Sequence, residues 1–291
     1  MRARDLGIKF EGQPGALNAI TDVPGLEVGM VTLISGEGDL IPDGGPVRTG
    51  VTAILPVGKK NTQQAIPAGI YSLNGNGEMT GSHWINETGG LSGPIMITNT
   101  HAVGTVHRGV IEWVKQNFPE AAMEWLLPVV AETWDGYLND INGAHVTTEH
   151  AISAIDSATS GQVSEGSHGG GTGMNCYGFK GGNGTASRTV PFGGKDYVVG
   201  VFVQANFGDR KELRIQGIDM SDLDVPNPMD ESTWLEKDKS RAVPGGAGSV
   251  IVVVATNAPL LPDQCRALAR RVPLGLARTG TAGGHFSGDI F

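Results

Sequence analysis

The chain has 291 residues, and 45 of them are glycine, which is about twice the share found in an average protein. A chain of this length can bury a full core without disulfides or metals, so we expect a single domain over residues 1–291. The net charge of −9 and the scattered basic residues exclude a surface for nucleic acids. No apolar run is long enough to cross a bilayer, which excludes a membrane partner.

Two further features of the sequence concern the cellular compartment. Arg2 and Arg4 have no apolar segment behind them, so we expect no signal peptide. The only cysteines are Cys176 and Cys265, which are too few for a disulfide framework or a zinc site. We interpret both as neutral thiols and expect a cytoplasmic protein.

Short strands and amphipathic helices are predicted in the first half of the chain. The strands are apolar runs bounded by glycine, proline or asparagine, and they cover residues 28–34, 51–56 and 94–98. From Val106 to Phe118, apolar residues recur every four positions, which predicts a helix that Pro119 ends. Residues 145–158 predict a second helix.

Polar residues follow two further predicted strands. The apolar run 126–131 predicts a strand that leads directly into Glu132 and Trp134. Residues 197–205 predict another strand, which ends at Asn206. Apolar strands that alternate with amphipathic helices indicate an α+β fold.

Two segments have an unusual composition. Residues 166–184 form the densest glycine block. The block lacks the Gly-Lys-Ser/Thr ending of a phosphate-binding loop, so we interpret it as a place where backbone passes close to a substrate cleft. Residues 218–247 are rich in aspartate and proline and predict an exposed acidic loop, which is longer than compact domains usually keep without a functional reason.

A serine stands at the first position of a buried strand, after a run of glycines. Gly248 precedes Ser249, and the apolar strand continues from Val250. Glycine permits a strained backbone in which the Ser249 hydroxyl reaches the preceding carbonyl. An N-to-O acyl shift would then cut the chain and free an α-amine with a pKa of about 7.7–8.0, which can act as base for its own hydroxyl. An ordinary strand-entry turn is the alternative, and spacing alone favours that turn.

Two segments around this junction, Gly248–Leu260 and Leu276–Gly280, closely resemble a family of self-processing aminopeptidases. That family comprises the L-aminopeptidase/D-Ala-esterase-amidases and the β-peptidyl aminopeptidases. Further blocks resemble it, in the same order, over nearly the whole chain: Asn18–Gly25, Arg48–Thr52, Leu73–Gly77, Asn99–His101, Gly169–Met174 and Phe179–Gly182. The resemblance implies a four-layer αββα sandwich, similar in layering to the N-terminal nucleophile hydrolases but differently connected.

The resemblance also implies where the chain is cut. Ser249 matches the family's nucleophile, and the bond between Gly248 and Ser249 matches its self-cleavage site. We therefore expect a large piece, 1–248, and a small piece, 249–291. The family's small piece continues well beyond this point, so the piece that ends at Phe291 is expected to be truncated and to leave a core strand unpaired.

Further roles follow from matching single residues to the family. Asn206 corresponds to the side-chain amide of the oxyanion hole, and Glu132 to the acid that receives the ammonium group of the substrate. Ser287 and Asp289 correspond to a serine–acid pair that contacts and orients the hydroxyl or amine of the nucleophile. Trp134 replaces a tyrosine of the L-aminopeptidases and loses its hydroxyl, so we interpret it as a pocket wall. Taken singly, these residues are more typical of turns and solvated surface.

The function implied by the resemblance is a self-activating serine aminopeptidase. It would release N-terminal residues from short peptides, amides or esters through an acyl-enzyme on Ser249. The alternatives are a β-peptidyl aminopeptidase or nylon-oligomer hydrolase of the same family, a related self-cleaving acyltransferase, and an uncleaved glycine-rich binding protein. No cofactor or metal is expected, since the seven histidines show no metal-ligand spacing. The partners implied are a peptide or amide with a free N-terminus and further copies of the cleaved heterodimer.

Overall fold

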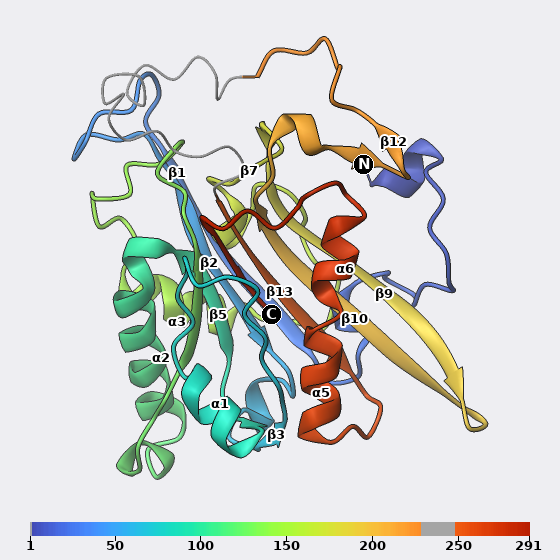
Figure 1. Cartoon of the computed structure of the whole chain (residues 1–291). Coiled ribbons are helices and arrows are strands. Elements are labelled where there is room, and N and C mark those ends of the chain that lie inside the picture. The colour runs from blue at the N-terminus through green and yellow to red at the C-terminus, as the bar shows by residue number, and fades with distance from the viewer. Residues whose placement is uncertain (1, 228–247) are drawn as a thin grey trace.

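Two four-stranded sheets face each other at the centre of the molecule (Figure 1). The computed structural model describes residues 2–227 and 248–291. The first sheet contains, in spatial order, β1 (Glu27–Ser35), β2 (Val47–Leu55), β5 (Ile95–Asn99) and β6 (Val129–Thr133). The second contains β14 (Ser287–Ile290), β13 (Gly248–Thr256), β10 (Lys195–Asn206) and β9 (Gly182–Phe192).

Helices cover the outer face of each sheet (Figure 1). On the first sheet lie α2 (Val103–Asn117) and α3 (Thr148–Asp156), and on the second lie α5 (Pro262–Ala269) and α6 (Val272–Ala277). One apolar cluster fills the space between the sheets, and one further cluster lies under each helical layer. This order of layers is αββα, which confirms the predicted fold class.

The other elements are short connections between these layers. They are α1 (Ser82–Thr88) and the strand pairs β3 (Ile66–Pro67) with β4 (Gly90–Leu91), β7 (Asn175–Cys176) with β8 (Phe179–Lys180), and β11 (Arg214–Ile215) with β12 (Ile218–Asp219). Short 3-10 turns lie at Ala3–Leu6, Ile20–Asp22, Lys59–Asn61, Thr100–Ala102, Ala121–Met123, Gly169–Gly171 and Arg210–Glu212. Within the described ranges, no helix has the length and apolar character to cross a membrane.

The predicted strands and helices are present, with shifts at their ends. The helix predicted from Val106 begins three residues earlier, at Val103. The sequence does not predict β9, because its small and polar residues form no apolar run, and it exists through pairing with β10 along its whole length. Of the predicted acidic loop, residues 228–247 lie outside the described residues.

The pairing of β13 decides which residues meet. It runs antiparallel to β10, with Ser249 opposite Asn206, and parallel to β14. On its other side β14 continues into Phe291, whose main-chain groups exchange hydrogen bonds of 2.8 and 2.9 Å with Tyr71. The expectation of an unpaired terminal strand is therefore wrong, because a segment from the first half of the chain supplies the second partner.

The glycine block passes between the two sheets. A Cβ at Gly170 would lie 2.8 Å from the carbonyl oxygen of Ile97 in the first sheet, and it would also collide with the Gln204 amide oxygen of the second. A Cβ at Gly173 would lie 2.8 Å from the Cβ of Asp135. No side chain fits at these positions, so the glycines permit a close approach of backbone, while a substrate cleft beside the block stays a prediction.

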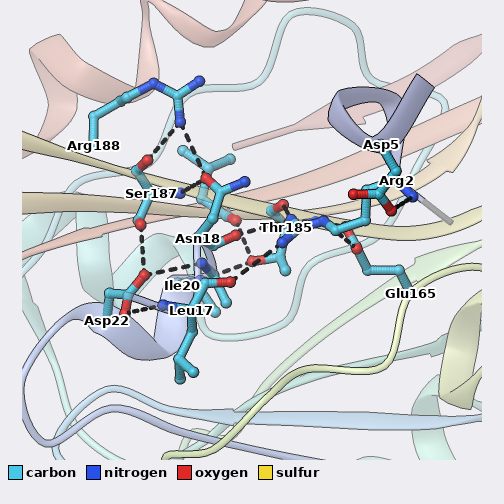
Figure 2. A network of polar contacts seen from close by, with 12 residues as sticks. Arg2, Asp5, Leu17, Asn18, Ile20, Asp22, Glu165, Thr185, Ser187 and Arg188 are labelled. Atoms are coloured by element: carbon cyan, nitrogen blue, oxygen red, sulfur yellow. Dashed lines mark hydrogen bonds and ion pairs between the residues drawn. The ribbon is translucent and has the colours of Figure 1, made fainter. Parts of the chain in front are cut away.

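The Asn18–Gly25 block forms a polar anchor on the edge strand β9 (Figure 2). The Asp22 carboxylate accepts the N–H groups of Leu17 and Ala19, at 2.9 and 3.1 Å, and the hydroxyl of Ser187, at 2.6 Å. Ser187 belongs to β9. The block therefore ties the start of the chain to the second sheet, away from the junction at Ser249.

Candidate active site

Ser249 lies at the start of β13, and its side chain faces the first sheet. The residue is buried, with 2% of its surface exposed. Its Oγ accepts a hydrogen bond of 3.2 Å from the backbone N–H of Trp134, which directly follows β6. The hydroxyl is therefore held at the point where the ends of the two sheets meet.

Asn206 lies opposite Ser249 in the antiparallel ladder, so both side chains leave the second sheet on the same face. Its Nδ2 donates to the carbonyl oxygen of Trp134 at 2.9 Å, and its Oδ1 accepts the N–H of Asn175 at 2.9 Å. These two bonds determine the orientation of the amide. Nδ2 carries a second N–H, on the residue that pairs with Ser249, and an amide N–H is the type of donor that an oxyanion needs.

Gly248 is a glycine for reasons of space. It is the first residue of the extended strand β13, and the strained backbone expected there stays a prediction. An added Cβ would collide with the carbonyl oxygen of Asn206 and would lie 3.1 Å from the Cα of Phe207. Any side chain here would push β13 away from β10.

Ser287 and Asp289 form a buried pair on β14. The Ser287 hydroxyl donates to Oδ1 of Asp289 at 2.5 Å. Burial raises the pKa of the Asp289 carboxyl, while this bond and the backbone N–H of Val250 act in the opposite direction. The two side chains therefore contact each other, while the role of the pair stays a prediction.

The serine–acid pair does not reach the Ser249 hydroxyl. In the parallel register Ser249 lies beside Gly288, and side chains alternate along a strand, so the two neighbours of Gly288 project from the opposite face. Between these described residues there is no hydrogen bond from Ser287 or Asp289 to Ser249. The predicted contact with the hydroxyl is not formed, and a contact with the Ser249 amine stays a prediction.

Glu132 is a buried carboxyl near the end of β6, with 3% of its surface exposed. It accepts hydrogen bonds from the Thr100 hydroxyl and, at 3.0 Å, from the backbone N–H of Glu78. Burial raises its pKa against the lowering effect of these bonds. Within the described part of the chain no cation forms an ion pair with it. Such a carboxyl is suited to a cationic group that arrives with a ligand.

Trp134 contributes its main chain as well as its ring. The residue is 37% exposed, and a Cβ on Gly136 would lie 2.6 Å from the indole, so glycine makes room for the ring. Its N–H contacts Ser249 and its carbonyl contacts Asn206. The sequence predicts a wall at this position but cannot indicate these peptide contacts, because every residue type carries the same groups.

Lys180 lies in the hairpin that contacts Asn206, and its residue type by itself does not mark it as a site residue. It pairs with Asn175 in the β7–β8 hairpin, and Asn175 in turn donates to Asn206. Its ammonium donates to two carbonyl oxygens, that of Met174 at 2.8 Å among them, and loss of water around it lowers its pKa to about 8. Lys180 does belong to Phe179–Gly182, one of the blocks in which the sequence resembles the aminopeptidase family.

The two cysteines are free. Burial raises the pKa of the Cys176 thiol to about 11, and it also raises that of Cys265. Both thiols are therefore neutral near pH 7, as predicted. Among the residues that the structure describes, no three histidine, cysteine, aspartate or glutamate side chains gather in a way that could hold a metal ion.

Comparison with known proteins shows relatives over the whole chain. The sequence model of peptidase family S58 matches residues 18–291. The beta-peptidyl aminopeptidase BapA of Sphingosinicella microcystinivorans is 54% identical over 293 residues, which cover 100% of this chain and 73% of that protein.

Solved structures resemble the fold at similar identity. The L-aminopeptidase D-Ala-esterase/amidase from Ochrobactrum anthropi, described as a variant of the Ntn hydrolase fold, has a TM-score of 0.89 at 46% identity and covers 100% of this chain and 77% of its own. A beta-aminopeptidase from Burkholderia sp. has a TM-score of 0.86 at 45% identity, with 100% and 76% covered. The chain therefore belongs to peptidase family S58, which makes it a hydrolase of the aminopeptidase type.

Proposed function

We propose that this chain is a self-activating serine aminopeptidase with Ser249 as its nucleophile. The observation that carries the proposal is the convergence on one hydroxyl: the Trp134 N–H contacts the Ser249 Oγ, and the Asn206 amide lies opposite on the neighbouring strand. A buried hydroxyl flanked by an N–H and an amide is suited to attack a carbonyl and to stabilise the oxyanion that forms.

The first reaction is the cleavage of the chain itself. The Ser249 Oγ attacks the carbonyl carbon of Gly248, and the bond from that carbon to the Ser249 nitrogen breaks, which leaves an ester and a free amine. Water then hydrolyses the ester, so that Gly248 ends as a carboxylate. Within the described residues no histidine hydrogen-bonds to the hydroxyl, and the new amine is the base that lies nearest to it by covalent structure.

The second reaction uses the same hydroxyl on a peptide. The ammonium group of the substrate binds the Glu132 carboxylate, which selects a free N-terminus. Ser249 attacks the first peptide carbonyl, and the second N–H of Asn206 stabilises the oxyanion. The leaving amine takes the proton that the Ser249 amine has received, and water hydrolyses the acyl-enzyme to release the N-terminal residue.

The substrate class follows from the relatives. The relative at 54% identity is named a beta-peptidyl aminopeptidase, and a structural neighbour at 46% is an L-aminopeptidase. We therefore propose short peptides that begin with a β-amino acid as the first substrates and L-aminoacyl amides as the second. An oligomer of cleaved heterodimers and a cytoplasmic location are further parts of this proposal, and the free thiols support a reducing compartment.

Denaturing electrophoresis and N-terminal sequencing test the proposal. The purified protein is expected to separate into pieces 1–248 and 249–291, and the second should begin Ser-Val-Ile-Val. Ser249→Ala should remain one piece and should not hydrolyse a β-aminoacyl p-nitroanilide. As the matched control, Ser153→Ala on the exposed face of α3 should be cleaved and active. A Ser249→Ala protein that hydrolyses the anilide would show that the nucleophile is another residue.

A further inference from the structure

Asp135 carries a buried carboxyl one residue beyond Trp134, which contacts Ser249. It follows Trp134 in the chain and is fully buried. Oδ1 accepts a hydrogen bond of 3.0 Å from the Asn139 amide, whereas Oδ2 has no partner among the described residues. An unpartnered carboxyl oxygen in the interior lowers the stability of the fold. A buried carboxyl that lowers stability at this position is therefore a candidate for a functional role.

Asp135 contacts both segments that hold the Asn206 amide. One is the Trp134 peptide group, whose carbonyl accepts from Nδ2 of Asn206, and which continues into Asp135 itself. The other is the segment from Gly173 to Asn175, where Asn175 donates to Oδ1 of Asn206. A Cβ on Gly173 would lie 2.8 Å from the Cβ of Asp135, so the two segments are in direct contact here. A shift of Asp135 would therefore move both partners of Asn206.

The turn that follows Asp135 is anchored to the first sheet. The Asp135 carbonyl accepts the N–H groups of Leu138 and Asn139, both at 3.0 Å. The Asn139 Oδ1 accepts the backbone N–H of Arg48 on β2 at 2.9 Å. Asp135 and Asn139 together thus connect β2 to the segment after β6 that carries Trp134.

The side chains that face the carboxyl are uncharged. From β2 and β5 these are Thr49 and Asn99, and from the following turn Asn139. The nearby charged groups are directed elsewhere. The Arg48 guanidinium donates to the carbonyls of Ser35, Val47 and Gly36. The Asp140 carboxylate accepts from the Asp43 N–H and pairs with His145.

We propose that Asp135 is a positioning residue for the aminopeptidase reaction, whose ionised carboxylate holds the Trp134 peptide and the Asn206 amide in place around the Ser249 hydroxyl. The inference rests on the proposed function of Ser249. Protonation removes an acceptor from a site where the Asn139 amide, the Thr49 hydroxyl and the N–H of Asp135 all favour the charged form. The arrangement around Asn206 then loosens, and turnover slows.

The acid side of the pH profile follows from this arrangement. Burial raises the pKa of Asp135 to about 7, although the hydrogen bonds from Thr49 and Asn139 act against it. The Ser249 amine has a reference pKa of about 7.7–8.0 and must also lose its proton before it can act as base. Two groups must therefore be deprotonated for full activity, and log kcat should fall with a slope approaching 2 at low pH.

The kinetic constants of Asp135→Asn test the proposal on the cleaved enzyme between pH 5 and 9, with a β-aminoacyl p-nitroanilide. We expect kcat at pH 8.5 to fall on the order of 10- to 100-fold, KM to change less than about threefold, and the acid-side slope to fall to 1. Asp140→Asn is the matched control, because Asp140 is a buried carboxyl of the same turn. It should keep the wild-type slope. An Asp135→Asn profile that coincides with the wild type overturns the proposal.

A second variant decides the question if Asp135→Asn does not fold. Thr49→Val removes a hydroxyl that lowers the Asp135 pKa, so the acid-side inflection of kcat should move to higher pH without a change in KM. An unchanged inflection overturns the proposal. Failure of the proposed function is separate, because it is read from activity of the Ser249→Ala enzyme, whatever the behaviour at Asp135.

Discussion

The backbone N–H of Trp134 donates a hydrogen bond of 3.2 Å to the Oγ of Ser249. The donor follows β6 in the first sheet, and the acceptor begins β13 in the second. The hydroxyl is therefore oriented by the way in which the two sheets pack, and not by its neighbours in the chain. Each residue that holds the two sheet ends together affects the geometry of this contact.

Replacing Asn206 by Asp tests its amide as a donor. The variant keeps an oxygen that accepts from Asn175, but it loses the N–H groups on the other side and places a negative charge near the carbonyl oxygen of Trp134. We expect kcat to fall by about 10²–10³. Asn257→Asp, at an exposed position beyond the far end of β13, is the matched control and should leave kcat unchanged. A kcat within about threefold of the wild type would exclude Asn206 from the oxyanion hole.

Replacing Gly248 by Ala tests whether this position needs space. The new Cβ collides with the carbonyl oxygen of Asn206, so β13 must move. We expect slower self-cleavage and a loss of about 1–3 kcal/mol in the free energy of unfolding. Gly275→Ala in α6 is the opposite case, because nothing lies within 4 Å of its added Cβ. It should gain up to about 1 kcal/mol and be cleaved at the normal rate. Time courses on gels and urea unfolding measure both effects.

Replacing Glu132 by Gln tests the ammonium site. The amide oxygen still accepts from Thr100 or Glu78, but the charge that attracts the substrate is gone. A charged hydrogen bond contributes about 1.5–3 kcal/mol, so KM should rise about 10- to 100-fold, with a smaller effect on kcat. Steady-state kinetics on an anilide with a free amino group, and on its N-acetylated form, distinguish a lost ammonium contact from a general loss of activity. If the variant keeps the wild-type KM for the free substrate, another group binds the ammonium.

Ionisation of three buried carboxyls should lower the free energy of unfolding as the pH rises above about 4. Burial raises the pKa of Glu132, Asp135 and Asp289 in the folded state, that of Asp135 from 3.8 to about 7. Below the pKa that these carboxyls have in the unfolded chain, all three are protonated in both states and do not change the free energy of unfolding. Above it the unfolded state releases protons first, and the loss of stability grows until the folded group ionises, at about pH 7 for Asp135.

Urea unfolding across this pH range measures the effect. Asp135→Asn removes one carboxyl whose pKa is raised. Between pH 4 and 7 the free energy of unfolding of the variant should therefore fall less than that of the wild type, and the difference should be on the order of 2–4 kcal/mol. Above pH 7 the two curves should run parallel. A wild-type and a variant curve that remain parallel from pH 4 to 7 would mean that Asp135 titrates at its ordinary pKa.

Most helices and strands of the layers can be predicted from the sequence, because they depend on the pattern of apolar residues within each segment. Apolar runs and four-residue periodicity predict α2, β10 and β13, since these elements bury one face or both. The strand β9 lacks such a pattern and depends on its partner β10, which sequence periodicity does not describe.

The candidate site divides in the same way. The sequence by itself determined the family and indicated Ser249, Asn206 and Glu132 as candidate site residues, because the resemblance rests only on residue types and their order along the chain. Only the tertiary structure decided that Trp134 contacts Ser249 and Asn206 through its peptide groups and that Ser287 lies on the opposite face from the hydroxyl. The physical reason is that strand register and sheet packing set these contacts, and both bring together segments that are distant in the chain. Trp134 is 115 residues from Ser249 and 72 residues from Asn206.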